Sequence, residues 1–373
     1  MAKHLNKTEK KKIPVAVKII LIFLAVILLI AGGILIYIDS KLNLIVFDNE
    51  VANSEISDPV SNTESSQEIN TEENIPEDEE AENEIVDIAG LEMVEKVPEA
   101  EEIMEGSDES TIFSDSNVMN ILLIGTDERS NSFSSNARSD SMIIVSINKA
   151  SGSVKLVSLE RGMGVPVLEG QYAGQYDWLT HIFRYGGANL LVKTVRTCFN
   201  LDIDKYVRVN FNSVKNVVDM IGGVDIYLTA AEANAIDADN TGHEVQTAGS
   251  GVYHLDGSKA LGFARLRSID SDWQRVERQR KVILAVVQKV KRANLFELDS
   301  MANAVLPLIQ TNLSKWEIAE LVTYVPSFVN SSFDQMTIPK SGTYGGMTGM
   351  GGRSMYAPNF QLNSEILREF LYE

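Results

Sequence analysis

The sequence predicts an α-β-α sandwich on a mixed, largely antiparallel sheet, preceded by one transmembrane helix and a disordered acidic linker. Three observations support this fold class. Strand and helix patterns are intermixed after residue 117, one pair of strands reads as a hairpin, and the composition changes sharply along the N-terminal third. A hydrophobic content of 44% in 373 residues is enough for a sizeable core. The antiparallel hairpin argues against a doubly wound parallel sheet.

The N-terminal segment has the pattern of a membrane anchor. Residues 1–18 form a basic tail with six lysines, and residues 19–38, IILIFLAVILLIAGGILIYI, carry no charge. A helix of this length spans about 30 Å, the thickness of a bilayer's hydrocarbon. The lysines before the run place the tail in the cytoplasm and the rest of the chain outside. A cleaved signal peptide is the alternative, although the run is long for one and no A-x-A site follows. We therefore expect a single-pass cell-membrane protein whose working part is extracytoplasmic.

Residues 39–112 have the composition of a disordered linker. Between residues 51 and 110 there are 21 acidic residues and a single base, Lys96. Such a segment cannot bury enough apolar surface to offset its ordering entropy. Residues 111–373 hold 25 basic and 27 acidic residues, so the net charge of −19 belongs to the linker. The folded domain is expected at 113–373.

Apolar runs predict the strands of this domain. The continuous run Met119–Ile124 predicts a strand that is buried on both faces. Residues 139–147 and 153–161 flank the turn NKASG, which predicts a β-hairpin. Residues 224–229, VDIYLT, predict a further strand. Polar and glycine-rich stretches separate these runs, and the glycines of residues 342–352 predict a flexible loop without the lysine of a phosphate-binding P-loop.

Helical spacing predicts five helices between the strands and after them. On the first helix the single cysteine, Cys198, shares a face with apolar residues, so it is expected in the core and not as a nucleophile. Asp272 is a natural N-cap for the long helix expected at residues 273–293. Paired glycines, Gly222 and Gly223, end the helix expected at residues 212–223. The five helices are expected at residues 186–200, 212–223, 273–293, 315–329 and 363–373.

Charged residues cluster where these elements end. Asp127 follows the first strand, Arg138 and Asp140 begin the hairpin, and Arg161 ends its second strand. Residues 261–280, LGFARLRSIDSDWQRVERQR, add five arginines. The ends of several strands and one helix N-terminus would then meet in a single charged site.

The arginine-rich stretch divides between a strand-like part and a helix. If residues 263–267 are extended, Arg265 and Arg267 share one face, because side chains alternate along a strand. On the helix that follows, Arg275, Arg278 and Gln279 are three and four residues apart and line one face of its first turns. The N-terminal end of that helix also favours anions.

Guanidinium groups beside carboxylates predict a metal-assisted phosphate site. Arginines bind phosphate oxygens in bidentate fashion, and aspartates among them would repel a phosphate unless a cation such as Mg²⁺ lay between. The pattern therefore indicates a Mg²⁺-assisted pyrophosphate site. A surface salt-bridge network with Asp270, Asp272 and Glu277 is the alternative. One cysteine and four histidines argue against a disulfide or a zinc cluster, and no patch suggests nucleic acid.

Seven blocks of the sequence, in order, resemble the LytR-CpsA-Psr family of membrane-anchored glycopolymer ligases of Gram-positive walls. The resemblance covers about residues 117–295, and the single N-terminal anchor fits it. The blocks are NILLIGTDER, ARSDSMIIVSIN, VKLVSLERG, YGGANLLVKTV, MIGGVDI, HLDGSKALGFARLR and DSDWQRVERQR. The fold implied is the α-β-α sandwich of that family.

The resemblance implies a phosphotransferase. It would move a teichoic acid, capsular or related glycan from a polyprenyl-pyrophosphate carrier to a peptidoglycan sugar hydroxyl, with Mg²⁺, or Mn²⁺ as the alternative, on the pyrophosphate. The family's metal-binding aspartates match Asp127 and Asp140, and Asp140 is also the candidate general base. The residues that match its pyrophosphate ligands are Arg138, Arg161, Arg265, Arg267, Arg275, Arg278 and Gln279. Of these, Arg161 and Arg275 join Asp140 as candidate catalytic residues.

The resemblance also carries expectations about the lipid and two departures. The lipid tail would enter an apolar channel with walls from helices 189–199 and 211–221. The family's usual Pro-Arg-Asp reads Glu160-Arg161-Gly162, so the aspartate that supports the arginine is absent at its usual position. The usual Asn-Ala-Tyr before Tyr-Gly-Gly is replaced by residues 180–184, THIFR, where His181 is expected to be structural and Arg184 is a possible further phosphate contact.

Two other classes of function stay open. A lipid pyrophosphate phosphatase would use the same metal and arginines with water as the acceptor. A non-catalytic membrane-bound regulator or wall-binding protein would not need the paired aspartates. The short basic tail also leaves no room for a DNA-binding domain. Transfer to a sugar, release of phosphate and dependence on Mg²⁺ separate these classes.

Overall fold

The computed structural model describes part of the chain, in two compact units that are residues 1–44 and 45–373. The described residues are 37–48, 86–94, 96–107, 111–128, 133–134, 137–241, 249–329 and 333–373. In the first unit these include a short helical segment at 37–42. The basic tail and the predicted anchor 19–38 lie outside the described residues, except for residues 37 and 38. Among the helices that are described, none has the length and apolarity to cross a bilayer.

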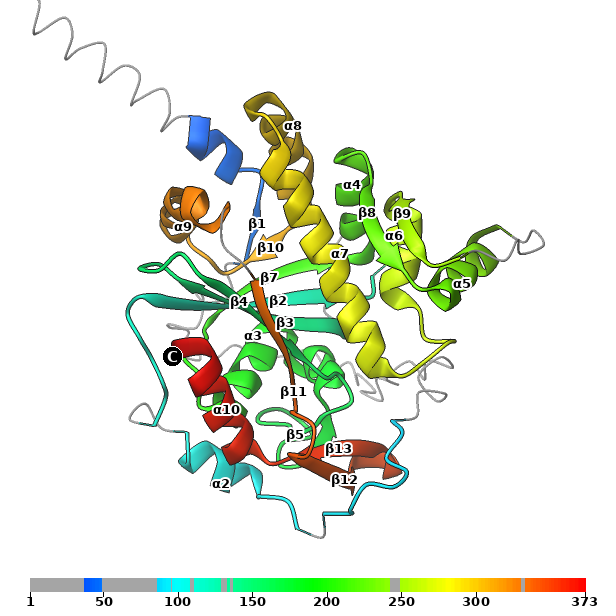
Figure 1. Ribbon diagram of the computed structural model, residues 1–373. Helices are drawn as coiled ribbons and strands as arrows, with labels where there is room; N and C mark the ends of the chain where they lie inside the picture. The colour runs from blue at the N-terminus through cyan, green and yellow to red at the C-terminus, as the bar shows by residue number, and fades with distance from the viewer. Residues whose placement is uncertain are drawn as a thin grey trace, which may run out of the picture. The chain divides into compact units, whose positions relative to one another are not determined.

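A seven-stranded mixed sheet forms the centre of the second unit (Figure 1). The predicted strand is β2, and the predicted hairpin is the antiparallel pair β3–β4. The mixed sheet is thus confirmed, but its parallel pairings β1–β10, β2–β7 and β4–β11 are as many as the antiparallel ones, so the antiparallel majority is not found. The strands, in spatial order, are β1 (Val46–Phe47), β10 (Gln310–Thr311), β7 (Lys205–Asn210), β2 (Val118–Thr126), β3 (Ser139–Asn148), β4 (Val154–Leu159) and β11 (Phe333–Ile338).

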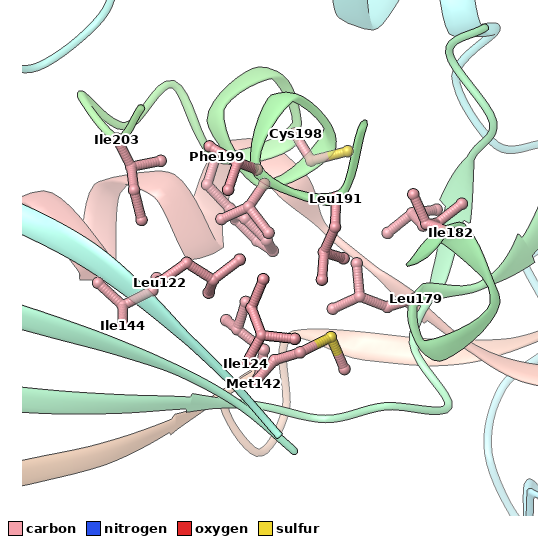
Figure 2. Close-up of a cluster of buried hydrophobic side chains, with 14 of the residues drawn as sticks. Leu122, Ile124, Met142, Ile144, Leu179, Ile182, Leu191, Cys198, Phe199 and Ile203 are labelled. Atoms are coloured by element: carbon pink, nitrogen blue, oxygen red, sulfur yellow. The ribbon is translucent and has the colours of Figure 1, made fainter. Parts of the chain in front are cut away.

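The helices α3 (Leu179–Phe199) and α10 (Phe360–Tyr372) cover one face of the sheet. Figure 2 shows side chains of β2 and β3, such as Leu122 and Ile144, packed against Leu191 and Phe199 of α3. Cys198 is buried in this cluster, and burial raises the pKa of its thiol. Its predicted place in the core is confirmed.

The helices α7 (Asp272–Arg292) and α9 (Lys315–Val329) cover the opposite face. Alternate side chains of the strands point this way, because successive residues of a strand face opposite sides. The sheet is therefore buried between two helical layers, as predicted. Helix α7 begins one residue earlier than expected, with Ser271 as its N-cap and Asp272 as its first helical residue. The predicted cap is wrong because the Asp272 carboxylate binds arginines instead.

A second hydrophobic cluster lies beyond the edge of this core and contains Val218, Ile226 and Phe263. The elements around it include a two-stranded ribbon, β8–β9. The helices expected to wall one lipid channel belong to different clusters, since α3 lies in the first core and α4 in this one. The elements are α4 (Phe211–Met220), β8 (Val224–Leu228), α5 (Ala230–Thr241), β9 (Gly251–Leu255), α6 (Gly257–Arg265) and α8 (Leu295–Val305), followed by the short turn η2 (Leu306–Leu308).

Two small ribbons form a third cluster around Trp178 and Met355. The glycines expected to form a flexible loop build a strand and a turn of this cluster instead. A Cβ on Gly345 would lie 2.4 Å from Glu92 O, so glycine is what lets residues 86–94 approach. The elements are α2 (Ala100–Glu105), β5 (Gly164–Pro166), β6 (Tyr176–Trp178), β12 (Tyr344–Thr348), η3 (Met350–Gly352) and β13 (Ser354–Pro358).

Parts of the expected linker 39–112 are folded. The strand β1 pairs with β10, residues 92–94 exchange backbone hydrogen bonds with Gly346, and α2 packs near α3. Residues 49–85, which include most of the acidic residues, lie outside the described part. The folded unit therefore starts at residue 45 and not at residue 113.

Candidate active site

A cavity of ≈ 450 Å³ opens where β4 ends and α7 begins. Segments far apart in the sequence reach it, including residues 86–87 and the ribbons of the third cluster. Most of the side chains around it are charged or aromatic. They come from Val86, Asp87, Glu160, Arg161, Gly162, Trp178, Arg267, Asp270, Ser271, Asp272 and Tyr356.

Two arginines share one carboxylate at the wall of this cavity. Asp272 Oδ2 accepts hydrogen bonds from Arg161 Nε and from Arg275 Nη2, each at 2.9 Å. Burial alone would raise the pKa of Asp272, but the charges of Arg275 and Arg161 outweigh it and hold the pKa at about 2. Burial and the charge of Arg161 lower the pKa of Arg275 to about 10, so the Arg275 guanidinium is charged at neutral pH.

Glu160 lies beside this group and is completely buried. Within the described residues, no hydrogen-bond donor reaches either of its carboxyl oxygens. Burial, and next the charge of Asp272, raise the pKa of Glu160 well above the usual value for a glutamate. Arg275 and Arg161 act in the opposite direction without cancelling this effect.

Two residues of the predicted face of α7, Arg278 and Gln279, bond to residues of neighbouring segments, although neither is in the cavity lining. Arg278 forms a bidentate pair with Asp270, at 2.7 and 2.6 Å, and donates to Leu266 O at 2.6 Å. These bonds fix the turn that leads into α7. Gln279 Nε2 lies 3.4 Å from Asp140 O, which connects the helix to the start of β3.

The two predicted metal ligands, Asp127 and Asp140, each lie beside an arginine. Asp127 accepts hydrogen bonds from Arg138 N at 2.9 Å and from Arg138 Nε at 3.1 Å. Asp140 Oδ1 is buried, lies 3.5 Å from Arg161 Nη1 and receives no hydrogen bond. Among the described residues, no three metal-ligating side chains form a group. One or two carboxylates suit Mg²⁺ when phosphates and water complete its coordination, and the bare Asp140 oxygen fits that use.

Arg265 and Arg267 do not share a strand face, because residues 257–265 form α6. Asp256 accepts from Lys259 N at 2.9 Å and caps this helix, which overrides the extended reading. Arg267 lines the cavity. The Arg265 guanidinium stacks on the Phe211 ring at 4.6 Å and is outside the cavity lining, so its phosphate role stays a prediction.

His181 and Arg184, the two residues expected beside the site, have different surroundings. His181 is buried and its Nδ1 lies 3.0 Å from Asp177 Oδ2, while its ring packs on Trp178 at 5.1 Å. The structural interpretation of this histidine is confirmed. Arg184 lies on α3 and is half-buried, and its contact with phosphate stays a prediction.

The presence of glycine at position 162 has a local steric reason. A Cβ at this position would lie 2.5 Å from Val86 Cγ2, so any other residue would collide with Val86 at the cavity wall. Arg161 does not lack support, because Asp272 binds its Nε. The carboxylate expected at position 162 is replaced by one from α7.

Comparison with known proteins decides the family. The family model described as the LytR_cpsA_psr family matches residues 82–369, which is more than half of the chain. The chain belongs to the LytR_cpsA_psr family. The polyisoprenyl-teichoic acid–peptidoglycan teichoic acid transferase TagU of Bacillus cereus is 31% identical over 255 residues, covering 68% of this chain and 78% of that protein. TagU of Enterococcus faecalis is 32% identical over 220 residues, covering 58% and 69%.

Solved structures show the same fold. The structure of TagT bound to LIIa-WTA has a TM-score of 0.55 and 26% identity, covering 72% of this chain and 96% of that one. The structure of TagT bound to LI-WTA has a TM-score of 0.54 and 26% identity, covering 72% and 96%. The α/β fold with a central mixed sheet is therefore that of LytR_cpsA_psr proteins.

Three carboxyls of this LytR_cpsA_psr site were not among its predicted residues, namely Glu160, Asp270 and Asp272. The sequence offered a signal for two of them. Asp272 precedes Arg275 by three residues on a helix, and a pair at that spacing can interact. Glu160 follows an apolar strand directly, where a buried acid is unexpected. Asp270 pairs with Arg278 across a turn whose conformation the spacing does not reveal.

Proposed function

We propose that this chain is a Mg²⁺-assisted phosphotransferase of the cell wall. Its substrate would be a teichoic acid, capsular or related glycan on a polyprenyl pyrophosphate, and its acceptor a peptidoglycan sugar hydroxyl. The observation that carries the proposal is the cavity wall on which Arg161 and Arg275 share the Asp272 carboxylate, with Arg267 beside them. Membership in the LytR_cpsA_psr family and the names of the TagU relatives support it.

The arginines would bind the pyrophosphate. A guanidinium offers five N–H donors, and a carboxylate that occupies one or two of them leaves the others for phosphate oxygens. Asp272 keeps Arg161 and Arg275 in fixed orientations, so little reorganisation is needed when negative charge develops on the leaving group. Arg267 is more exposed and would contact the outer phosphate.

Asp127 and Asp140 would hold the metal ion, whose chemistry is the neutralisation of charge on the pyrophosphate. The fit rests on the Asp140 Oδ1 atom, which is buried without a hydrogen-bond donor. Arg138 fixes Asp127 from two directions. The same Asp140 carboxylate is the candidate acceptor for the proton of the attacking hydroxyl.

The proposed step balances without a further reactant. The sugar hydroxyl oxygen attacks the phosphorus that carries the glycan, and a new P–O bond forms. The P–O bond to the polyprenyl phosphate breaks, and polyprenyl phosphate leaves. The hydroxyl proton passes to a base of the site. With the chain held by its apolar segment 19–38, both the lipid substrate and the wall would be within reach of an extracytoplasmic domain.

The test uses the full chain in detergent with a short-chain polyprenyl-pyrophosphate oligosaccharide, peptidoglycan fragments and Mg²⁺, followed by mass spectrometry. We expect a phosphodiester-linked adduct that EDTA abolishes. Polyprenyl phosphate without an adduct would favour the phosphatase. Lipid binding without turnover would favour a wall-binding protein. The N-terminal boundary matters, because a fragment that starts at residue 113 would lack β1 and residues 86–94.

A further inference from the structure

Glu160 is a buried carboxyl at the cavity wall that the proposed reaction does not use. It follows β4 directly, and its backbone N donates to Ile338 O at 2.8 Å, so the main chain holds it in place. Its side chain is 0% exposed, and within the described residues its two oxygens receive no hydrogen bond. A carboxylate in that state would be desolvated and unsatisfied, whereas a neutral acid can donate its own hydrogen.

The surroundings of Glu160 favour the neutral acid. The ring of Trp273 stacks on Tyr344 and packs against Tyr356, with both centroid distances at 5.5 Å, and the charge of Glu160 acts on both tyrosines, which places it near this aromatic group. The titratable and charged groups around it come from its own segment, from α7, from both strands of the β12–β13 ribbon and from the cavity. They are Arg161, Asp272, Arg275, Tyr344, Tyr356, Asp87, Arg267 and Asp270.

Of these groups, Asp272 is the one to which a protonated Glu160 would donate a hydrogen bond. Its Oδ2 is taken by two guanidiniums, and a second carboxylate next to it would be repelled. The charges of both arginines hold Asp272 ionised, while Glu160 carries the raised pKa. Of these two neighbouring carboxyls, the buried one without donors therefore keeps the proton.

We propose that Glu160 is a positioning residue that holds a proton at neutral pH and donates it to Asp272, so that one carboxylate, not two, lies between Arg161 and Arg275. Two guanidiniums and one carboxylate leave a charge of +1 for the phosphate, whereas two carboxylates would cancel it. The identity of the bound anion rests on the proposed function. The assignment of a proton to Glu160 is independent of that function.

The proposal also accounts for the unusual Glu160-Arg161-Gly162 sequence. Val86 fills the space beside Gly162, so a carboxyl cannot be placed there. A glutamate two residues earlier is buried near Arg161, close enough for the two charges to interact. The carboxyl is retained near Arg161, in a neutral form that does not compete with the phosphate.

The first arm of the test measures the thermal midpoint of the full chain between pH 5 and 9 for the native protein, Glu160→Gln and the exposed control Glu369→Gln. A raised pKa means that stability is complete below the ordinary carboxyl value of about 4.3 and declines as pH rises toward the raised value. We expect the native protein and the control to decline, and Glu160→Gln to lose that decline. The same slope in all three proteins would overturn the proposal.

The second arm measures the affinity for farnesyl pyrophosphate over the same pH range. We expect native affinity to fall on the order of tenfold as Glu160 ionises, because one charge is added beside the arginines. Glu160→Gln keeps a donor for Asp272 and should bind within about twofold of native at pH 6, with no fall at higher pH. Glu160→Leu fills the space without a donor and should bind more weakly at every pH.

The two arms separate the possible failures. Equal binding by the Leu and Gln variants would mean that Glu160 only fills space, which overturns the proposal. If no variant binds farnesyl pyrophosphate while the pH slope of stability depends on Glu160, the proposed function fails and the proton assignment stands.

Discussion

Arg275 and Arg280 lie on the same helix, both are buried, and they have opposite kinds of surroundings. Arg280 Nη1 donates to Ser158 Oγ, Met336 O and Thr337 Oγ1 at 2.7 to 2.9 Å, so it joins β4 to the edge strand β11. Arg275 binds a carboxylate that it shares with Arg161 at a cavity. An arginine held by neutral oxygens of the interior stabilises the fold, whereas one held by a shared carboxylate beside open space is available to an anion.

The strongest test of this contrast is Arg275→Ala. Loss of a guanidinium that stabilises phosphoryl transfer costs about 1,000-fold in rate, or about 4 kcal/mol. We expect that loss in the transfer assay, normalised to folded protein. Arg292→Ala, at the exposed end of the same helix, is the matched control and should retain the native rate. Native activity in Arg275→Ala would remove the distinction between the two arginines.

The converse change is Arg280→Ala. It leaves three acceptors of β4 and β11 without their donor, so we expect the free energy of unfolding to fall by about 3 kcal/mol. Denaturant titration measures this loss. The transfer rate per folded molecule should change by less than about twofold, and a large fall in rate with unchanged stability would contradict the structural role.

A third change, Gly162→Asp, tests the wall of the cavity next to Arg161. The new Cβ collides with Val86, and we expect the unfolding free energy to fall by about 2 to 3 kcal/mol. Combining it with Val86→Ala should recover most of the loss, which a double-mutant cycle measures. Gly249→Ala, where the Cβ meets no atom, should be neutral. Additive losses in the double variant would exclude the collision.

The smallest expected effect is the loss of stability at low pH that depends on Asp272. The pKa of Asp272 is lowered to about 2, so its contribution is complete above its unfolded value of about 3.9 and is lost as pH falls toward 2. We expect about 2 kcal/mol of unfolding free energy to disappear over that window. Asp272→Asn should be less stable at pH 6 and should lack this part of the acid dependence. An unchanged acid limb in the variant would show that the arginines do not depend on Asp272.

The central strands and the long helix of the fold can be predicted from the sequence, whereas the short strands at its edge cannot. The strands β2, β3 and β4 and the helix α7 have long apolar patterns that the structure confirms. The two-residue strands β1 and β10 have too few residues to form a pattern. The extended conformation considered for residues 263–267 is not found, because Asp256 caps α6 and the helix runs to Arg265.

The site was predictable as a set of residue types but not as a set of partners. Spacing placed Arg275, Arg278 and Gln279 on one face of a helix, and the structure agrees. Which carboxyl each arginine binds depends on the turn before α7 and on side chains that arrive from elsewhere. Glu160 and Asp272 come together through the fold, since they are far apart in the sequence, and no periodicity reveals such a pair.

The strand β1 determines where a force applied to the N-terminus first acts on the folded unit. Its two residues are bonded to β10, with Val46 N donating to Ile309 O at 3.0 Å and Asp48 N to Thr311 O at 2.9 Å. Tension applied from the N-terminus reaches this short pairing before it reaches residues 49–85, because both ends of that stretch are attached to the folded unit. A pull from the N-terminus is therefore resisted first by the few backbone hydrogen bonds between β1 and β10, and only after they break by the rest of the sheet.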